Sequence, residues 1–419
     1  MSNSLKFPKK FLWGAGNSAH QVEGGLHNQW TVWELENARS LAARAPYRFG
    51  ELDNWSSIAR EAKNPNNYVS GRSVDHYRRY EEDFDLLERM GLNSFRCSIE
   101  WSRIEPKQGA WDAGEIEHYR TYLRALKKRG ITPVVTLFHS TLPVWFAELG
   151  GFEKRRNVKY FAQFAEKIFE ELGRELEYVI TINEPTVYAL QSYEEGNWPP
   201  NQMSGRAAFR VLEHLIVAHK KVYALARNSE HARRLKVSMA HRVNYFYPGD
   251  DARVTRLTTW GKDFQENGWV LRRVRKQSDF LAVNYSQAFR MYGTRAHNSE
   301  LLEQNDLGWD MQPELLEDLL KDLWEQHRLP IMIAENGVAD AEDSRRIDWL
   351  KASISAMHRA LESGVRVIGY QHASLLDSFE WDRGYWVKFG LVAVNRRTME
   401  RTLRDSGKWY GQVVRRLSK

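Results

Sequence analysis

Residues 121–138 read TYLRALKKRGITPVVTLF, and this stretch contains the junction that decides the fold. Leu123 and Leu126 have the spacing of residues on one face of a helix, and Gly130 follows at a position where helices often end in the left-handed conformation. The run Thr132–Phe138 is short, apolar and rich in β-branched side chains, as expected for a strand that is buried on both faces. The stretch therefore predicts a helix followed by a strand of a parallel sheet.

The same junction recurs along the chain, because Gly91 and Gly364 also stand between a helical pattern and a short apolar run. Counting all such runs gives eight, with helical patterns between them: Phe11–Gly16, Ser94–Ser98, Thr132–Phe138, Tyr178–Ile182, Lys236–Ala240, Phe280–Val283, Ile331–Ala334 and Val367–Tyr370. Eight alternations predict an α/β fold, a single (β/α)₈ TIM barrel. A doubly wound open sheet is the structural alternative. No Gly/Ser-rich or Pro-rich linker divides the sequence, so we expect residues 1–419 to form one domain.

Composition narrows the class of protein. The chain has 419 residues, of which 42% are hydrophobic, with a mean hydropathy of -0.61. It contains no apolar run of about 18 residues, and the apolar stretch near its N-terminus is short and interrupted, so we expect no membrane span and no secretory signal. Cys97 is the single cysteine and is interpreted as a small buried hydrophobe rather than a nucleophile. These features favour a cytoplasmic protein.

Charge and aromatic content suggest the kind of partner. The net charge is +7, but the basic residues are spread among 54 acidic ones, which favours a solvated basic surface over a nucleic-acid site. Sixteen tryptophans could build a large aromatic core or stack on sugar rings, and composition does not separate the two. We expect a small-molecule partner, with no nucleic acid and no membrane, and the oligomeric state stays open.

Polar side chains with useful chemistry stand at or beyond the carboxyl ends of the predicted strands. They are Arg96, Glu100, His139, Asn183, Glu184, Asn284, Glu335 and His372. In (β/α)₈ barrels this end of the strands carries the active site. Loops are polar in general, which explains any one of these residues but not so many of them at equivalent positions.

Glu184 and Glu335 are the candidate catalytic pair. Cleavage of a glycoside with retention needs two carboxyl groups about 5–5.5 Å apart, one to donate a proton and one to attack the anomeric carbon. At the ends of the fourth and seventh predicted strands, the two would face each other across the barrel mouth. We expect Pro185 to hold Glu184 in an extended backbone and Gly337 to permit a sharp turn after Glu335. Arg96 could keep a nearby carboxylate ionised.

The sequence resembles glycoside hydrolase family 1 over nearly its whole length. The segments that carry the resemblance, in matching order and spacing, are FLWG (11–14), HQVEG (20–24), FRCSIEWSRI (95–104), TINEP (181–185), AENG (334–337), SLLDSFEW (374–381) and FGLV (389–392). The resemblance implies a single (β/α)₈ catalytic domain. It also implies hydrolysis of β-glucosides, β-galactosides or related glycosides through a covalent glycosyl-enzyme intermediate. The sequence has 13 histidines but no H-E-x-x-H pair, and we expect no metal and no cofactor.

The resemblance also implies residue roles. Glu184 matches the acid/base, Glu335 the nucleophile, and Arg96 the arginine beside the nucleophile. The positions that hold the glycone are matched by Gln21, His139, Asn183, Glu380 and Trp381. We add Asn284, at the end of the sixth strand, as a substrate contact. Members that act on 6-phosphosugars usually lack the glutamate matching Glu380, so we expect an unphosphorylated substrate, either a small β-glycoside or an oligosaccharide.

Three positions depart from the family pattern. Ala373 replaces a tryptophan, Ser140 an aromatic residue, and Ser286 the tyrosine that usually bonds the nucleophile. Tyr285 is one position off and should point to the opposite side of an extended segment. The departures predict a roomier, less selective glycone subsite and a slower enzyme on simple glucosides. A loop tryptophan could fill the space: Trp198 or Trp309.

Two other functions remain open. A sugar-binding protein on a catalytically weak barrel would explain Ala373 and Ser286, although both glutamates are retained. The second is a nucleotide-dependent oxidoreductase, because the stretch GAGNSA (14–19) with Glu34 fits a dinucleotide fingerprint. The residues after this stretch form a poor helix broken at Gly24-Gly25, which counts against a nucleotide site. His372 is interpreted equally well as a hydroxyl partner or as a core histidine.

Overall fold

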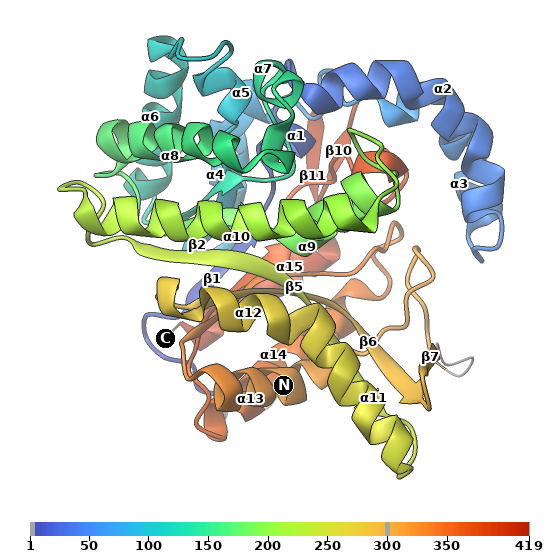
Figure 1. The fold of residues 1–419 in the computed structure, drawn as a ribbon. Coiled ribbons are helices and arrows are strands. Elements are labelled where there is room, and N and C mark those ends of the chain that lie inside the picture. The colour runs from blue at the N-terminus through green and yellow to red at the C-terminus, as the bar shows by residue number, and fades with distance from the viewer. Residues whose placement is uncertain (1–4, 298–301, 419) are drawn as a thin grey trace.

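The computed structural model describes residues 5–297 and 302–418, and a closed barrel of parallel strands lies at its centre (Figure 1). The barrel strands are β1 (Leu12–Gly16), β2 (Ser94–Ser98), β3 (Thr132–Phe138), β4 (Tyr178–Asn183), β5 (Lys236–Pro248), β6 (Leu281–Tyr292), β8 (Ile331–Asn336) and β9 (Val367–Ala373). β1 pairs with β2 and β9, and β5 pairs with β4 and β6, so each barrel strand has a neighbour on both sides. The predicted barrel is confirmed, and the open-sheet alternative is wrong.

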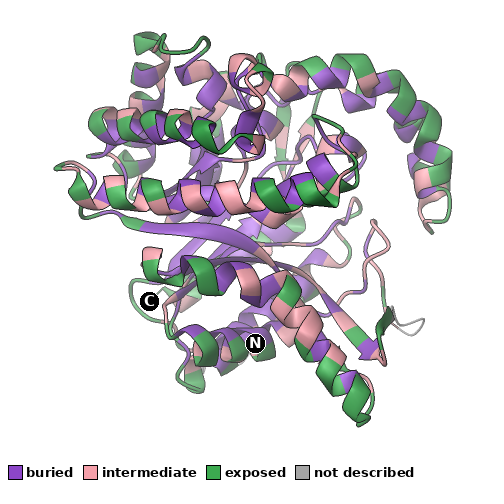
Figure 2. Cartoon of the chain, viewed as in Figure 1, coloured by how far each residue is buried: buried purple, intermediate pink, exposed green. Residues whose placement is uncertain are grey.

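Helices connect consecutive barrel strands and form the outer layer. They are α1 (Ala19–Val22), α2 (Gln29–Phe49), α3 (Trp55–Ala62), α4 (His76–Met90), α5 (Trp101–Ile104), α6 (Ala113–Lys128), α7 (Val144–Glu148), α8 (Val158–Leu172), α9 (Pro185–Ala189), α10 (Gly205–Asn228), α11 (Arg253–Asp263), α12 (Trp269–Val274), α13 (Leu316–His327), α14 (Arg346–Glu362) and α15 (Asp405–Leu417). Buried residues face the barrel and exposed ones face outward along the long helices (Figure 2). None of the described helices is long and apolar enough to span a bilayer.

The helix-to-strand junctions follow the pattern of the sequence. Gly91, Gly130 and Gly364 all have positive φ, at 76°, 70° and 87°. Each therefore ends its helix in the left-handed region that glycine enters without steric cost. The chain can then reverse direction and enter the next strand.

The core has two layers because strand side chains alternate between the two faces of the sheet. Val134 belongs to a small apolar cluster formed mainly by residues of the barrel strands, while its neighbour Val135 packs in the larger cluster between strands and helices. Cys97 lies in the outer layer, where burial raises the pKa of its thiol to about 12. The interpretation of Cys97 as a buried hydrophobe is confirmed.

Two barrel strands extend far beyond their predicted ends. β5 and β6 stay paired as far as Pro248 and Met291, whereas the apolar runs stop at Ala240 and Val283. These extensions mix polar, aromatic and aliphatic residues, so a search for continuous apolar runs misses them. β6 then turns back into the short strand β7 (Arg295–His297), and α11 packs along the ribbon (Figure 1). The extension raises one wall above the barrel rim.

Candidate active site

A cavity of about 200 Å³ lies at the carboxyl ends of the barrel strands. All of the side chains that the sequence predicted for the site line it: Gln21, Arg96, His139, Asn183, Glu184, Asn284, Glu335, Glu380 and Trp381. These residues come from segments that lie far apart in the chain. Barrel closure therefore brings the predicted residues together in one place.

A chain of hydrogen bonds links the two candidate catalytic glutamates. The Arg96 guanidinium donates to Glu335 Oε1 and, through Nη2, to Asn183 Oδ1 at 2.7 Å. Asn284 Nδ2 donates to the same Asn183 Oδ1 at 3.1 Å and to Glu184 Oε1 at 2.8 Å. The two carboxyl groups are thus positioned by one shared scaffold.

Glu184 adopts a left-handed backbone, with φ 45° and ψ 59°, so the predicted extended conformation is wrong. Pro185 disfavours the right-handed helical region for the residue before it, and the left-handed region remains available. The Glu184 N–H donates to Ala240 O on β5 at 2.9 Å, which ties the strained residue to the neighbouring strand. Non-glycine residues in this region cost about 1 kcal/mol or more and concentrate at functional sites.

Gly337 does not form the sharp turn that we expected after Glu335. Its φ is not positive, so no turn requires glycine there. A Cβ at this position would lie 1.7 Å from the Ala373 carbonyl oxygen. Glycine is needed because the ends of β8 and β9 approach each other closely.

The electrostatics of the cavity follow from burial and from Arg96. Burial raises the pKa of Glu335 to about 7, the charge of Glu184 adds to the rise, and Arg96 opposes it. Burial also raises the pKa of Glu380 to about 8. Gln21 Nε2 and Ser378 Oγ donate to Glu380 Oε1 at 3.1 and 3.2 Å. Burial in the cavity therefore makes Glu335 and Glu380 weaker acids than an exposed glutamate.

His139 is a neutral member of the network. Burial and the charge of Arg96 hold the pKa of this histidine well below its usual range. Because Asn183 Oδ1 accepts from Arg96 and Asn284, the Asn183 amide nitrogen faces His139 and donates to its Nε2 at 3.1 Å. His139 can then present its other ring nitrogen to a ligand as a donor.

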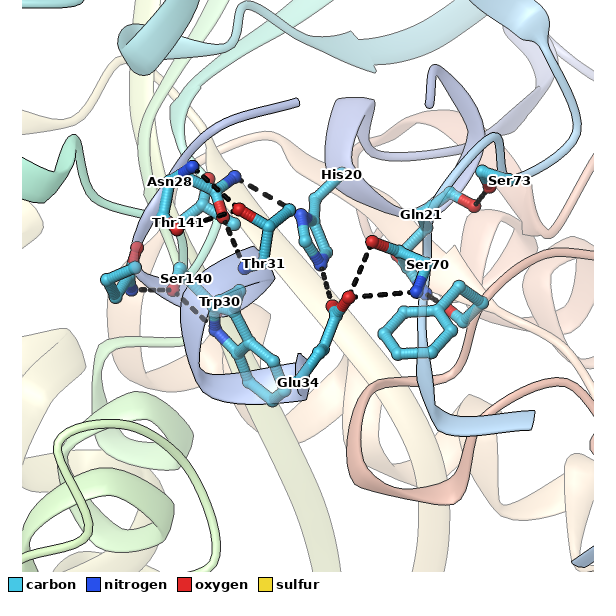
Figure 3. A network of polar contacts seen from close by, with 12 residues as sticks. His20, Gln21, Asn28, Trp30, Thr31, Glu34, Ser70, Ser73, Ser140 and Thr141 are labelled. Carbon is cyan, nitrogen blue, oxygen red and sulfur yellow. Dashed lines mark hydrogen bonds and ion pairs between the residues drawn. The ribbon is translucent and has the colours of Figure 1, made fainter. Parts of the chain in front are cut away.

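Trp381 forms an aromatic wall that is supported from behind by His20. The two rings stack at 5.5 Å between centroids with 8° between their planes. His20 is held between Asn28 and Glu34, and Glu34 also accepts from the Ser70 backbone N–H and hydroxyl (Figure 3). Both ring nitrogens of His20 are therefore used within the protein, and the residue has a structural role.

The same network removes the basis for the dinucleotide hypothesis. Glu34 is occupied by His20 and Ser70 rather than free for a ribose. After the glycine stretch, α1 spans only Ala19–Val22, which is too short a helix to hold a pyrophosphate at its N-terminus.

Comparison with known proteins decides the family. The chain matches the glycosyl hydrolase family 1 model over residues 3–278 and 274–418. The chain belongs to glycosyl hydrolase family 1. It is 31% identical to Beta-glucosidase A of Acetivibrio thermocellus, with 99% of each sequence covered. It is 28% identical to a β-galactosidase of Sulfolobus acidocaldarius, with 98% of this chain and 95% of the relative covered.

Solved structures of family 1 proteins have the same fold. A β-glycosidase from Pyrococcus horikoshii matches with a TM-score of 0.85 at 30% identity, covering 99% of this chain and 96% of the other. A β-glucosidase from Thermotoga maritima in complex with glucoimidazole matches with a TM-score of 0.84 at 27% identity, covering 98% and 99%. The predicted family membership is confirmed.

The three departures from the family 1 pattern all lie at the cavity, because Ser140, Ser286 and Ala373 line it. Tyr285 is buried and its hydroxyl donates to Gln312 O at 2.7 Å, so it points away as predicted. Among the described residues, Arg96 is the only side chain that hydrogen-bonds to Glu335. Both tryptophans proposed to fill the space also line the cavity: Trp198 and Trp309.

Two of the polar residues at the strand ends lie outside the cavity. Glu100 accepts from Ser102 and Thr141 at 2.7 and 2.9 Å within the protein. His372 is fully buried, with the Tyr370 hydroxyl 3.3 Å from its Nδ1. His372 is therefore a core histidine whose hydroxyl partner is a side chain of the protein, the Tyr370 hydroxyl.

Sequence reasoning missed two basic residues of the cavity, Arg242 and Arg383. Arg242 lies just beyond the predicted end of the fifth strand, at a position equivalent to those of the recognised residues. Arg383 ends the short 3₁₀ turn that begins at Trp381. The sequence could have indicated both residues, because Arg242 follows the fifth predicted strand and Arg383 follows the predicted site residue Trp381 by two positions.

Proposed function

We propose that the chain is a retaining β-glycosidase that hydrolyses β-glucosides, β-galactosides or related glycosides through a covalent glycosyl-enzyme intermediate. The observation that carries the proposal is that Glu184 and Glu335 line one cavity and are positioned by one hydrogen-bonded scaffold. Membership of glycosyl hydrolase family 1 supports it.

In the first step, Glu335 attacks the anomeric carbon while Glu184 protonates the leaving oxygen. The attack requires Glu335 to be ionised, and the Arg96 guanidinium stabilises the negative charge on Glu335. The bond to the aglycone breaks as the ester bond to Glu335 forms. In the second step Glu184, now a carboxylate, takes a proton from water, and the hydroxyl of that water displaces Glu335.

The glycone is held by the remaining predicted residues. Gln21 and Glu380 are hydrogen-bonded to each other and can bind adjacent sugar hydroxyls as donor and acceptor. His139 offers a donor, and the Trp381 ring offers an apolar face for the sugar. The Glu380 carboxyl group would repel a phosphate once ionised, so the proposed glycone is unphosphorylated.

The proposed enzyme is one catalytic domain, residues 1–419. A single apolar cluster contains residues from Phe11 before β1 to Val414 in α15, which supports one folding unit. A single cysteine suits a reducing compartment, so a cytoplasmic location belongs to the proposal.

Covalent labelling tests the function. Incubation with a 2-deoxy-2-fluoro β-glucoside that carries a good leaving group should add one sugar mass to a peptide containing Glu335. The fluorine slows both steps of the reaction, but the good leaving group keeps formation of the intermediate faster than its hydrolysis, so the intermediate accumulates. Glu335→Ala is the control and should remain unlabelled. Stabilisation by glycosides with neither labelling nor turnover would instead support the sugar-binding alternative.

Ala373→Trp tests whether the glycone subsite is roomier than usual. The new indole should supply a surface for the sugar ring and raise kcat/KM on an aryl β-glucoside. A panel of aryl β-glycosides in gluco, galacto, fuco, manno and xylo forms should then show narrower selectivity than the parent enzyme. A clear loss of kcat/KM in the folded variant would count against the idea that position 373 leaves usable space.

A further inference from the structure

Two arginines of the cavity stand outside the scaffold that holds the glutamates. Arg242 lies on β5 and pairs with Asn284 on β6, and Arg383 lies in the turn Trp381–Arg383. Their guanidinium carbons are 5.5 and 5.8 Å from the centroid of the Trp309 ring. Two elements far apart in sequence therefore bring two positive charges to one aromatic side chain.

Within the described residues, neither guanidinium group has the acidic hydrogen-bond partner that other partly buried arginines of this protein have. Arg401 and Arg404 bond to Asp83 and Asp377 at 2.8 and 2.7 Å. Arg242 Nη2 donates only to the neutral amide oxygen of Gln287, at 2.7 Å, and its buried Nε has no partner in the described structure. Unpaired charge in a partly buried site is costly.

Arg383 has fewer polar contacts than Arg242. Within residues 5–297 and 302–418, its guanidinium forms no hydrogen bond or ion pair with another side chain. Burial lowers the pKa of Arg383, the charge of Asp382 opposes the shift, and the charges of Arg48 and Arg242 add to it. A bound anion would relieve both the desolvation and the repulsion.

The acids of the cavity do not neutralise the pair. Glu335 bonds to Arg96, Glu184 to Asn284, and Glu380 to Gln21 and Ser378. None of these hydrogen bonds involves Arg242 or Arg383. The charges of Asp382 and Glu380 act on Arg383 from nearby, and that of Glu335 acts on Arg242, without an ion pair among the described residues. A ligand anion can supply the direct partner that both guanidinium groups lack.

The location points to the leaving group of the substrate. Arg242 is two residues after Ala240, whose carbonyl accepts from the Glu184 N–H, and its strand partner Asn284 bonds to the Glu184 carboxyl group. Glu184 adjoins the leaving oxygen in the proposed reaction, so Arg242 lies on the aglycone side. The glycone contacts Gln21 and His139 come from the other arc of the barrel, after β1 and β3. Arg383 approaches Trp309 from the turn that also carries the glycone contact Trp381, so Arg242 is the residue that sets the aglycone side.

We propose that Arg242 and Arg383 bind a carboxylate or phosphate on the aglycone, whose ring or chain packs on Trp309, so that the natural substrate is an acidic β-glycoside. The inference rests on the proposed function and names the substrate class of the same site. Guanidinium groups suit this role because their donors match the geometry of carboxylate and phosphate oxygens.

Two aryl glucosides that differ in one charge provide the test: 4-carboxyphenyl and 4-carbamoylphenyl β-glucoside. The enzyme should prefer the carboxylate, by about 10-fold or more in kcat/KM at low salt, and added salt should reduce the preference. R242Q and R383Q should each lower the ratio of the two kcat/KM values by about 10-fold, because each removes a charge-assisted hydrogen bond. R383K should restore part of the ratio. R253Q, at an exposed position on α11, is the matched control and should leave the ratio as in the parent.

Further arms separate the sources of the anion. A phosphorylated aryl glucoside tests phosphate on the aglycone, and an aryl β-glucuronide tests a carboxylate on the glycone. A preference for the glucuronide that depends on Arg242 and Arg383 would overturn the placement on the aglycone. A ratio near one in the parent enzyme, or a ratio unchanged in both variants, would overturn the inference altogether.

Calorimetric binding of the same two glucosides to Glu335→Gln makes the result independent of turnover. Tighter binding of the carboxylate, lost in R242Q and R383Q backgrounds, would support the anion site even if the parent enzyme proved inactive. In that case the proposed function would fail and the inference would stand. Turnover without charge preference would give the reverse result.

Discussion

At the residue scale, the proposed role of Glu184 as proton donor predicts that the effect of its replacement on the rate depends on the leaving group. Glu184→Gln removes the proton donor but keeps an amide that Asn284 can still contact. We expect kcat/KM for phenyl β-glucoside to fall by about 10²–10⁴-fold, the usual contribution of general acid–base catalysis. The first step with 2,4-dinitrophenyl β-glucoside should suffer much less, because that leaving group needs little protonation. Equal losses on the two substrates, measured by steady-state and burst kinetics, would remove Glu184 from this role.

Glu380 links the proposed binding role to pH. Its folded-state pKa is about 8 against an ordinary value of 4.5, so the folded state retains a proton that the unfolded state releases between these limits. The stability that protonated Glu380 contributes is therefore complete below about pH 4.5 and is lost as the pH rises to 8.

Glu380→Gln carries no titrating proton and should escape this loss. Relative to the parent, the variant should gain about 1–3 kcal/mol between pH 5 and pH 8.5, a figure reduced from the full pKa difference because Glu380 faces the cavity. Thermal melts across this range measure the change. Glu36→Gln, at an exposed position on α2, should show a constant difference from the parent. A Glu380→Gln difference that is equally flat would contradict the raised pKa.

Sequence motifs predicted which residues would lie together, while their roles in the reaction stay predictions. All of the predicted site residues line the cavity, but the backbone of Glu184 was wrong, because Pro185 excludes the right-handed region without choosing between the others. Arg242 and Arg383 were missed because no motif marks them. They stand out only by the absence of an acidic hydrogen-bond partner, and that absence can be seen only in the folded structure.

At the scale of elements, Gly130 and Gly261 should respond to the same substitution with opposite signs. A Cβ at either position meets nothing within 4 Å, so packing does not decide the outcome. Gly130 has φ 70°, and Gly130→Ala should cost about 1 kcal/mol in strain. Gly261 lies within α11, where Gly261→Ala should stabilise by about 0.5–1 kcal/mol. Urea unfolding at constant m-value measures both; two changes of the same sign would show that backbone conformation is not the cause.

The prediction of strands from the sequence was limited because it relied on continuous apolar runs. Continuous apolar runs located all of the barrel strands because those segments are buried on both faces. The β5–β6 ribbon beyond the rim is only partly buried, and its mixed polar and aromatic residues resemble loop sequence until the pairing is seen. The missed ribbon also carries Arg242, so the error in the element led to the error in the site.

For the whole molecule, closure of the barrel ties the two ends of the chain together. The Tyr410 hydroxyl on α15 donates to Gly14 O on β1 at 3.1 Å, and α15 packs against α4. The apolar cluster that contains Phe11 also contains Val414, so unfolding of either end exposes the same core. One domain of this kind predicts one cooperative transition.

The prediction is tested by comparing urea unfolding curves recorded with three different probes. Activity on an aryl glycoside, tryptophan fluorescence and far-UV circular dichroism should share one urea midpoint, because no part of the barrel can open without breaking strand pairs on both sides. Tyr410→Ala should move all three midpoints down together, since it removes a buried ring and leaves the Gly14 carbonyl without its donor. Tyr410→Phe should give a smaller shift of the same kind. If activity were lost at lower urea than fluorescence in the parent, the rim would be a separate unit and the single-domain proposal would fail.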